Sequence, residues 1–410
     1  MELSRNISNR NFKSYIWHAI FAALAINFMD VDTVLPAMLI HSGGGTFLVG
    51  LMSAIMLGGS RMSQLFFTPF LQNRQHKKIF LLVGINSRIF SLLGLALLFY
   101  LSPQITQEWV IIFIFMLIIT FSIGGAFAEI PYTDIIGKSI FPESRKRFFS
   151  LKQLLSGVSV FLSALAAQQL LHHFTFPDNY LAMFLLAAAF LGLASIGFYS
   201  IIEFIKEEHK TERIPNLKVF VQKIVKELKE HQQLTFYILV VNTLGVGLAI
   251  LPFIILFAKT KMVVNATVVG ELLVFKTIGL VLTSFVIYQF SNKFKYKQLL
   301  YFSISLLILM VITAIIFMEH PFVFRLLFLC GGIFVSLFTI TKAGLLLEIS
   351  TDQNRAFYTG LTGASNLLLT IFPLISGIII GLWGFAYFFG LTLFLLLLSG
   401  YFAYHLKCYS

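Results

Sequence analysis

Two long apolar stretches, broken only by short polar gaps, flank one densely charged segment at residues 205–233. Each stretch is long enough for about six membrane-spanning helices at about 20 residues per helix. The chain is 58% hydrophobic and 12% charged, whereas soluble domains are about 45–50% apolar and about 25% charged. A water-soluble fold could not bury this much apolar surface, so the sequence predicts an all-α membrane protein with twelve transmembrane helices in two six-helix bundles.

The predicted spans lie at about 14–40, 46–71, 79–101, 109–137, 148–171, 180–204, 234–258, 266–290, 298–318, 322–348, 357–382 and 384–406. They divide the chain into an N-terminal six-helix bundle (1–204), a linker (205–233) and a C-terminal six-helix bundle (234–410). Within the linker, apolar residues recur at helical spacing over 216–230, with lysines opposite them. This pattern predicts an amphipathic helix on the membrane surface, and a solvated linker helix is the alternative.

The formal net charge of +12 would suggest nucleic-acid binding in a soluble protein. Here the basic residues fall in alternate gaps between spans, such as 74–78 and 138–152, while the gaps at 41–46 and 102–108 contain no Lys or Arg. This distribution follows the positive-inside rule and places the linker and both termini in the cytoplasm. We therefore exclude nucleic acid as a partner and expect a multi-pass protein of a bacterial inner (plasma) membrane. No cleavable signal peptide is expected, because the first apolar run is too long.

Short segments of the first half recur in the second half at similar offsets. NRQHKK (73–78) matches NKFKYK (292–297), and TVLPAML (33–39) matches AILPFII (249–255). Internal duplication of six-helix units with the same topology is typical of parallel-repeat transporters.

With these features the chain resembles the major facilitator superfamily of transporters over nearly its whole length. The family pattern after the second span is G-x-x-x-D-R-x-G-R-[RK], and this chain has P-F-L-Q-N-R-Q-H-K-K over 69–78. The basic positions match, whereas the glycines and the acidic residue are replaced. The resemblance implies that this loop latches against neighbouring helices in the outward-facing state. We expect a gating loop formed by Asn73, Arg74, Lys77 and Lys78, in which Asn73 lacks the carboxylate of the family's charge latch.

Charged side chains inside a membrane are costly unless they are paired, so each one is a functional candidate. On a regular helix Asn27 and Asp30 share a face and Asp32 points away, so we favour Asp30 as the cavity-facing carboxylate. Pro36 frees the carbonyl of Asp32, so a local break there could reverse that choice. Arg88 is expected to be either a structural partner of Glu129 or a loop anchor. The candidates for substrate binding and proton coupling are Asn27, Asp30, Asp32, Arg61, Glu129, Tyr132, Asn242, Lys276 and Lys342.

The resulting prediction is a secondary active transporter that moves a small polar solute by alternating access, with anionic solutes favoured by the basic candidates. Symport with protons is expected, because a carboxylate shielded from water can exchange a proton near neutral pH, and sodium coupling stays open. We expect no cofactor, no metal site and no enzymatic chemistry, because the sequence contains no catalytic constellation. The expected partners are the solute and membrane lipids, and the expected state is a monomer.

Two alternatives stay open. The first is an exporter of amphipathic drugs or lipids, whose cavity would be mostly apolar and aromatic. The second is a non-transporting membrane receptor on a transporter scaffold, in which the buried charges would form closed ion pairs.

Overall fold

The computed structural model describes residues 4–59, 76–203, 225–290, 294–317, 320–349 and 367–406, and the single positions 67, 71, 358 and 361. Within these ranges the chain is helical and contains no β-strand. Among the described residues, ten helices are long and apolar enough to cross a membrane, and two shorter apolar helices cover Thr46–Gly59 and Leu368–Trp383. Helical segments therefore occur at all twelve predicted positions, and the all-α prediction is confirmed.

The helices of the first half are α1 (Arg5–Ile26), η1 (Asn27–Met29), α2 (Val34–His41), α3 (Thr46–Ala54), the π-helical turn η2 (Ile55–Gly59), α5 (Lys78–Leu101), η3 (Ser102–Gln104), α6 (Gln107–Ser139), α7 (Pro142–His173) and α8 (Asp178–Ser200). Two predicted boundaries were wrong by more than a few residues. Helix α1 begins at Arg5, whereas the first span was predicted from about residue 14. The gap expected between the fourth and fifth spans is reduced to Ile140 and Phe141, because α7 begins at Pro142. Pro is well suited to the first turn of a helix, where its missing N–H has no intrahelical acceptor.

The helices of the second half are α10 (Gln232–Gly245), η4 (Val246–Ala249), α11 (Ile250–Lys261), α12 (Ala266–Gln289), α13 (Tyr296–Phe317), α14 (Pro321–Ile349), α16 (Leu367–Trp383) and α17 (Phe385–His405). Residues 225–230 are also helical. The rest of the predicted amphipathic helix lies outside the described residues, so the linker and its boundaries at 205 and 233 stay predictions.

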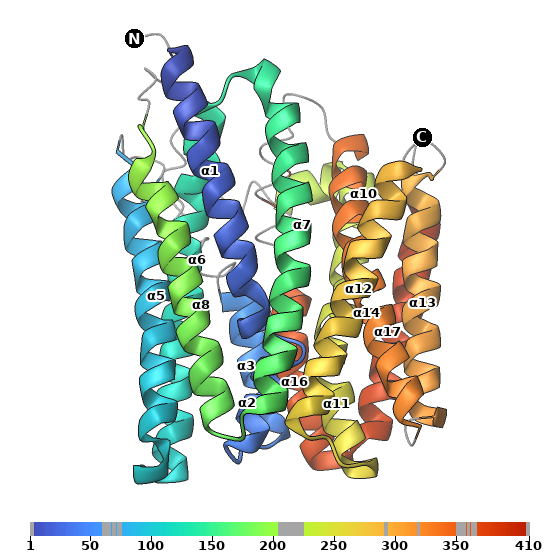
Figure 1. Ribbon diagram of the computed structural model, residues 1–410. Coiled ribbons are helices and arrows are strands. Elements are labelled where there is room, and N and C mark those ends of the chain that lie inside the picture. Colours follow the sequence, from blue (N-terminus) through green and yellow to red (C-terminus); the bar gives the residue numbers. More distant parts are fainter. Residues whose placement is uncertain are drawn as a thin grey trace. The chain divides into compact units, whose positions relative to one another are not determined.

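The chain forms two compact units, residues 1–44 with 59–213 and residues 45–58 with 214–410. Helix α3 comes from the first half of the sequence but belongs to the second unit, because it packs along α16 (Figure 1). Gly50 on α3 approaches the backbone of Pro373 and Gly377, and Gly377 in turn approaches the backbone of Thr46 and Phe47. Small residues at a helix crossing let two backbones come this close.

Each unit repeats the same helix pairings. In the first unit α5 packs against α6 and α8, and α1 packs against α7 and α8 (Figure 1). In the second unit α13 packs against α14 and α17, and α10 packs against α16 and α17. These are the corresponding spans of the two halves, so the packing agrees with the duplication indicated by the sequence.

The first span of each half is broken at an equivalent place. After α1 the chain forms the 3-10 turn η1 and a non-helical stretch at residues 30–33 before α2, whereas the 3-10 turn η4 alone separates α10 from α11. Pro36 and Pro252 follow these breaks. In a continuous helix each proline ring would clash with the carbonyl four residues earlier, at Asp32 and Leu248, so the sequence accounts for both breaks.

Candidate functional site

The break in the first span positions the carboxylate of Asp30. Asp30 Oδ1 accepts hydrogen bonds from the backbone N–H of Asp32 at 3.1 Å and from the hydroxyl of Thr33 at 2.8 Å. The backbone carbonyl of Asp30 accepts a bond from Leu35 N at 3.0 Å. Asp30 therefore stabilises the turn that starts α2, since a carboxylate can satisfy donors that have no intrahelical partner.

The placement of Asn27 and Asp32 corrects the argument from a regular helix. Asn27 is buried, and its Nδ2 donates to the backbone carbonyl of Val160 on α7 at 2.6 Å. Residues 27–29 form a 3-10 turn and residues 30–33 are not helical, so the argument from a regular helix does not apply here, and which of Asp30 and Asp32 faces the cavity stays a prediction. Asp32 is only 7% exposed, so it is the more buried of the two carboxylates.

A second polar group surrounds Tyr132 on α6. Lys152 Nζ on α7 donates to the Tyr132 hydroxyl at 2.9 Å and lies 5.1 Å from the centroid of its ring. The ring of His18 on α1 stacks on Phe198, with centroids 3.7 Å apart, and lies 6.0 Å from the Tyr132 ring. His18 also interacts electrostatically with Lys152 and Arg88. Three basic side chains and one phenol therefore gather inside the first unit.

Arg88 lies beside Glu129, as the sequence predicted. The two side chains interact electrostatically, and the Arg88 guanidinium lies 4.2 Å from the centroid of the Phe121 ring. Glu129 is exposed on the surface of its unit. The Arg88–Glu129 interaction joins α5 to α6 within the first unit.

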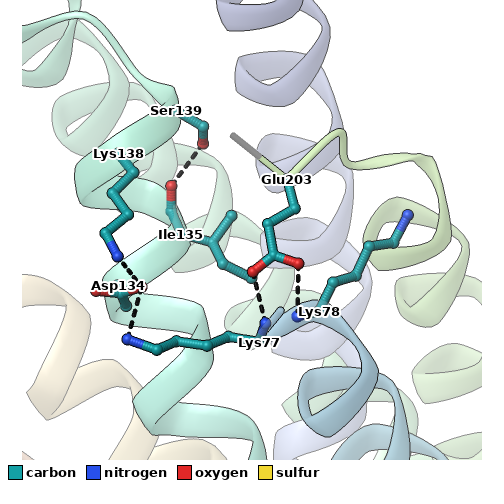
Figure 2. Close-up of polar contacts among 7 residues, drawn as sticks. All are labelled: Lys77, Lys78, Asp134, Ile135, Lys138, Ser139 and Glu203. Atoms are coloured by element: carbon teal, nitrogen blue, oxygen red, sulfur yellow. Dashed lines mark hydrogen bonds and ion pairs between the residues drawn. The ribbon is translucent and has the colours of Figure 1, made fainter. Parts of the chain in front are cut away.

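At the start of α5, five charged residues form a cluster that we call the charge cluster: Lys77, Lys78, Asp134, Lys138 and Glu203 (Figure 2). Asp134 Oδ2 receives Lys77 Nζ at 3.1 Å and Lys138 Nζ at 2.9 Å. The Lys77 side chain is 7% exposed, so its interaction with Asp134 is shielded from water. The structure thus places Asp134 against Lys77 of the predicted gating loop.

Glu203 and Lys78 cap each other's helices within the charge cluster. The Glu203 carboxylate accepts the backbone N–H of Lys77 at 2.6 Å and of Lys78 at 3.1 Å, which satisfies donors at the start of α5 (Figure 2). Lys78 Nζ donates to the carbonyls of Tyr199 at 2.8 Å and Ile201 at 2.6 Å, at the end of α8. An acid at a helix start and a base at a helix end both interact favourably with the helix dipoles.

Two residues of the predicted gating loop, Lys77 and Lys78, belong to the charge cluster. Asn73 and Arg74, and also Arg61, lie outside the described residues. Lys77 and Lys78 are contacted by carboxylates from α6 and from the residues after α8. The loop lacks its own carboxylate at Asn73, but neighbouring helices supply carboxylates to its lysines.

In the second unit, Asn242 joins α10 to the start of α16. Its Nδ2 donates to the Ile238 carbonyl at 2.9 Å, and its Oδ1 accepts the backbone N–H of Leu368 at 3.1 Å. Lys276 on α12 is 8% exposed. The carbonyl of Lys342 on α14 accepts the Tyr237 hydroxyl at 2.9 Å. Asn242 therefore has a clear packing role, and the transport roles of Lys276 and Lys342 stay predictions.

Comparison of the chain with solved structures identifies the fold. A POT family transporter in complex with a thioalcohol-conjugated peptide is similar with a TM-score of 0.70 and 12% identity, covering 97% of both chains. The nucleoside transporter NupG has a TM-score of 0.67 and 12% identity, covering 96% of this chain and 98% of its own. A bacterial homologue of the human lysosomal transporter Spinster, inward-facing and unoccupied, has a TM-score of 0.64 and 12% identity, covering 98% and 97%.

The chain has the major facilitator fold. The predicted resemblance is thereby confirmed at the level of fold, and the chain is an integral multi-pass membrane protein. No protein-family model matches the sequence, and no curated protein matches it. Structural similarity at 12% sequence identity establishes the fold but does not identify the solute.

No group of three or more His, Cys, Asp or Glu among the described residues is arranged to hold a metal ion. His172 and His173 are exposed at the end of α7. The carboxylates of Asp30 and Asp32 lie beside a helix break, and the bases near Tyr132 lie on packed helices. Carboxylates of this kind can carry protons, and the bases can interact with an anionic group.

Proposed function

We propose that this protein is a secondary active transporter that moves a small polar solute by alternating access, coupled to protons. The observation that carries the proposal is the equivalent break in the first span of each half, with Asp30 and Asp32 at one of the two breaks. In secondary transporters, discontinuous helices near the bilayer midplane supply backbone groups for solute and ion binding at the interface between repeats. Irregular backbone inside a membrane is tolerated where it is buried in protein or lines a cavity.

An anionic solute is favoured by the basic side chains of both units. In the first unit Lys152 bonds to Tyr132, and in the second unit Lys276 is 8% exposed. Buried cations form strong hydrogen bonds with carboxylates and phosphates, and they are costly in a membrane when unpaired. The comparison proteins support the class of function, because two of them are described as transporters of the POT family and of nucleosides.

Proton coupling is proposed through the carboxylates at the break, with Glu129 as the second candidate. Both donors from its own turn reach Oδ1 of Asp30, so Oδ1 can keep these bonds while Oδ2 gains or loses a proton. The proposal also includes a bacterial inner-membrane location and a monomeric state. The cytoplasmic position of both termini is proposed from the distribution of Lys and Arg. Reporter fusions at each terminus would test the orientation.

A thermal-shift screen of the purified full chain in detergent tests the proposal first. The screen covers amino acids, sugars, nucleosides, organic anions and cationic amphiphiles, each at acidic and neutral pH. We expect stabilisation by one polar class, stronger at one pH, because a ligand that binds only the folded state raises its stability. Stabilisation by amphiphiles alone would favour an exporter.

Transport is then measured with the stabilising compound in proteoliposomes that contain a trapped pH-sensitive dye. A coupled transporter gives solute-dependent proton flux that follows the imposed gradient. Binding without any flux in either direction would contradict the proposal and favour a receptor.

A further inference from the structure

An open pocket of about 480 Å³ lies between the first three turns of α1 and the end of α8. We call it the α1–α8 pocket, and its lining residues are Asn6, Asn9, Arg10, Lys13, Ser14 and Ser200. All six side chains are polar, and two are cationic. Arg10 Nε donates to the Ser200 carbonyl at 3.0 Å, which anchors the guanidinium beside α8 while it keeps further N–H donors for a ligand. The volume of the α1–α8 pocket falls in the range of about 300–1,000 Å³ that is usual for small-ligand sites.

The electrostatic surroundings of the α1–α8 pocket favour an anion. Lys78 lies close enough to Arg10 for the two cations to repel each other. Glu203 interacts with Lys78 and offsets part of this charge, while Lys13 lies on the exposed face of α1. A phosphate between Arg10 and Lys13 would accept charge-assisted hydrogen bonds from both and reduce the repulsion among the cations.

Below the pocket, the same face of α1 becomes apolar. One stripe along the helix contains Asn6 and the residues four, seven and eleven positions after it, which are Arg10, Lys13 and Trp17. Trp17 is 42% exposed, and its Nε1 donates to the Leu193 carbonyl of α8 at 2.7 Å. The ring centroids of Trp17 and Phe21 lie 4.6 Å apart.

Helix α8 presents matching apolar side chains beside Trp17. Leu193 is 39% exposed and Ile196 is 51% exposed. Trp and Tyr concentrate where the headgroup region meets the hydrocarbon. The stripe therefore passes from a basic headgroup level, through an aromatic interface, to a lipid-facing apolar surface.

We propose that the α1–α8 pocket binds the headgroup of an anionic glycerophospholipid whose acyl chains lie along Trp17, Leu193 and Ile196. Arg10 and Lys13 hold the phosphate, and the amides of Asn6 and Asn9 bind headgroup hydroxyls. Basic pockets between transmembrane helices at the headgroup level bind anionic lipids by this combination of charge and apolar contact. This site is separate from solute transport and stands whether or not the protein transports.

Trp17 provides a reporter inside the proposed site. The chain has three tryptophans, and Trp109 and Trp383 are exposed at 55% and 61%, so W109F/W383F should leave a folded protein with Trp17 alone. This full-length variant is reconstituted in phosphatidylcholine liposomes that contain the same mole fraction of either brominated-chain phosphatidylglycerol or brominated-chain phosphatidylcholine. We expect phosphatidylglycerol to quench Trp17 with at least about fivefold higher relative affinity, the change that one Lys or Arg contributes beside an anionic lipid.

Two double variants locate this preference in the pocket. R10Q/K13Q in the W109F/W383F background should bring the two lipids to equal quenching. K226Q/K229Q removes the same charge from exposed positions elsewhere and should keep the preference. Circular dichroism and size-exclusion profiles check the fold of each variant, and K13Q alone serves if R10Q disturbs the bond to Ser200.

Three outcomes would overturn the lipid assignment. The first is equal quenching by both lipids in the Trp17 background. The second is a preference that survives in both R10Q/K13Q and K13Q. The third is thermal stabilisation by inorganic phosphate in detergent without any lipid preference, which would indicate a site for a free anion.

Discussion

Glu203 caps the helix that begins at Lys78: its Oε2 accepts the Lys78 backbone N–H at 3.1 Å, across 125 residues of sequence. In turn, the Lys78 Nζ donates to backbone carbonyls at the end of α8. Each residue thus satisfies backbone groups that a helix end leaves without partners. The start of α5 and the end of α8 are fixed to each other by charge as well as by packing.

Removal of this cap should lower the stability of the first unit. Glu203→Ala leaves the N–H groups of Lys77 and Lys78 without their acceptor, and hydrogen bonds to charged groups contribute about 1.5–3 kcal/mol each. Glu203→Gln keeps one acceptor oxygen and should cost less. Thermal unfolding in detergent measures both variants, with Glu108→Gln as the control because Glu108 is exposed in the first turn of α6. Equal stability of all three variants would show that the cap has no energetic role.

The Lys77–Asp134 pair gives a second prediction. Asp134→Asn leaves Lys77, whose side chain is 7% exposed, without its counter-charge, and breaking a buried pair by removing one partner costs about 3–5 kcal/mol. Because the Asp134 side chain is 28% exposed, the loss of stability in Asp134→Asn should be at or below the lower end of this range, about 3 kcal/mol. Lys138→Gln should cost less than about 1 kcal/mol, because its pair with Asp134 is more accessible.

A double-mutant cycle separates the pair from its surroundings. K77Q/D134N should recover part of the loss in D134N, with a coupling of about 0.5–3 kcal/mol, because the double variant no longer buries an unpaired charge. Melting temperatures of the wild type, both single variants and the double variant give the coupling. Strict additivity of the single losses would mean that the two charges do not stabilise each other.

The close approach of α3 and α16 predicts a steric effect. A Cβ on Gly50 would overlap the carbonyl of Pro373, which belongs to the backbone and cannot rotate away. Gly50→Ala should therefore destabilise the second unit by about 1–3 kcal/mol, as overpacking does. At Gly390, on the exposed face of α17, a Cβ meets nothing within 4 Å, so Gly390→Ala should be neutral or slightly stabilising. The melting temperatures should fall for the first variant only.

The fold could be predicted from the sequence because a bilayer restricts spanning segments to helices with satisfied backbone groups. Apolar runs of the right length, the alternation of basic gaps and the matched segments were enough to place the spans. The segment 27–33 was harder, because Pro36 indicates a break but does not show where the freed groups bond. Its geometry depends on the Asn27–Val160 and Asp30–Thr33 contacts.

The candidate site was only partly predictable. Lys152 was counted with the basic residues of the gap at 138–152, although it also lies within the span predicted at about 148–171, and Pro142 followed by Glu143 is a helix-start signal that places it on α7. His18 carries no formal charge at neutral pH, so the search for charges in the spans missed it. Glu203 could not have been matched to Lys78, because their contact depends on the packing of α5 against α8.

The carboxylate of Asp30 gives the sharpest test of proton coupling. Asp30→Asn keeps an oxygen that can accept from Asp32 N and Thr33 Oγ1, but it cannot take up or release a proton. This variant should express and melt like the wild type, bind the solute found in the screen, and lose transport driven by a pH gradient. Asp30→Ala also removes the acceptor, so it should melt at a lower temperature, with a cost of about 0.5–2 kcal/mol typical of a lost cap. Solute exchange without a gradient should survive in the Asn variant, because exchange requires no net proton movement. Gradient-driven uptake with normal pH dependence in Asp30→Asn would remove Asp30 as the coupling group and direct the same pair of substitutions to Asp32 and Glu129.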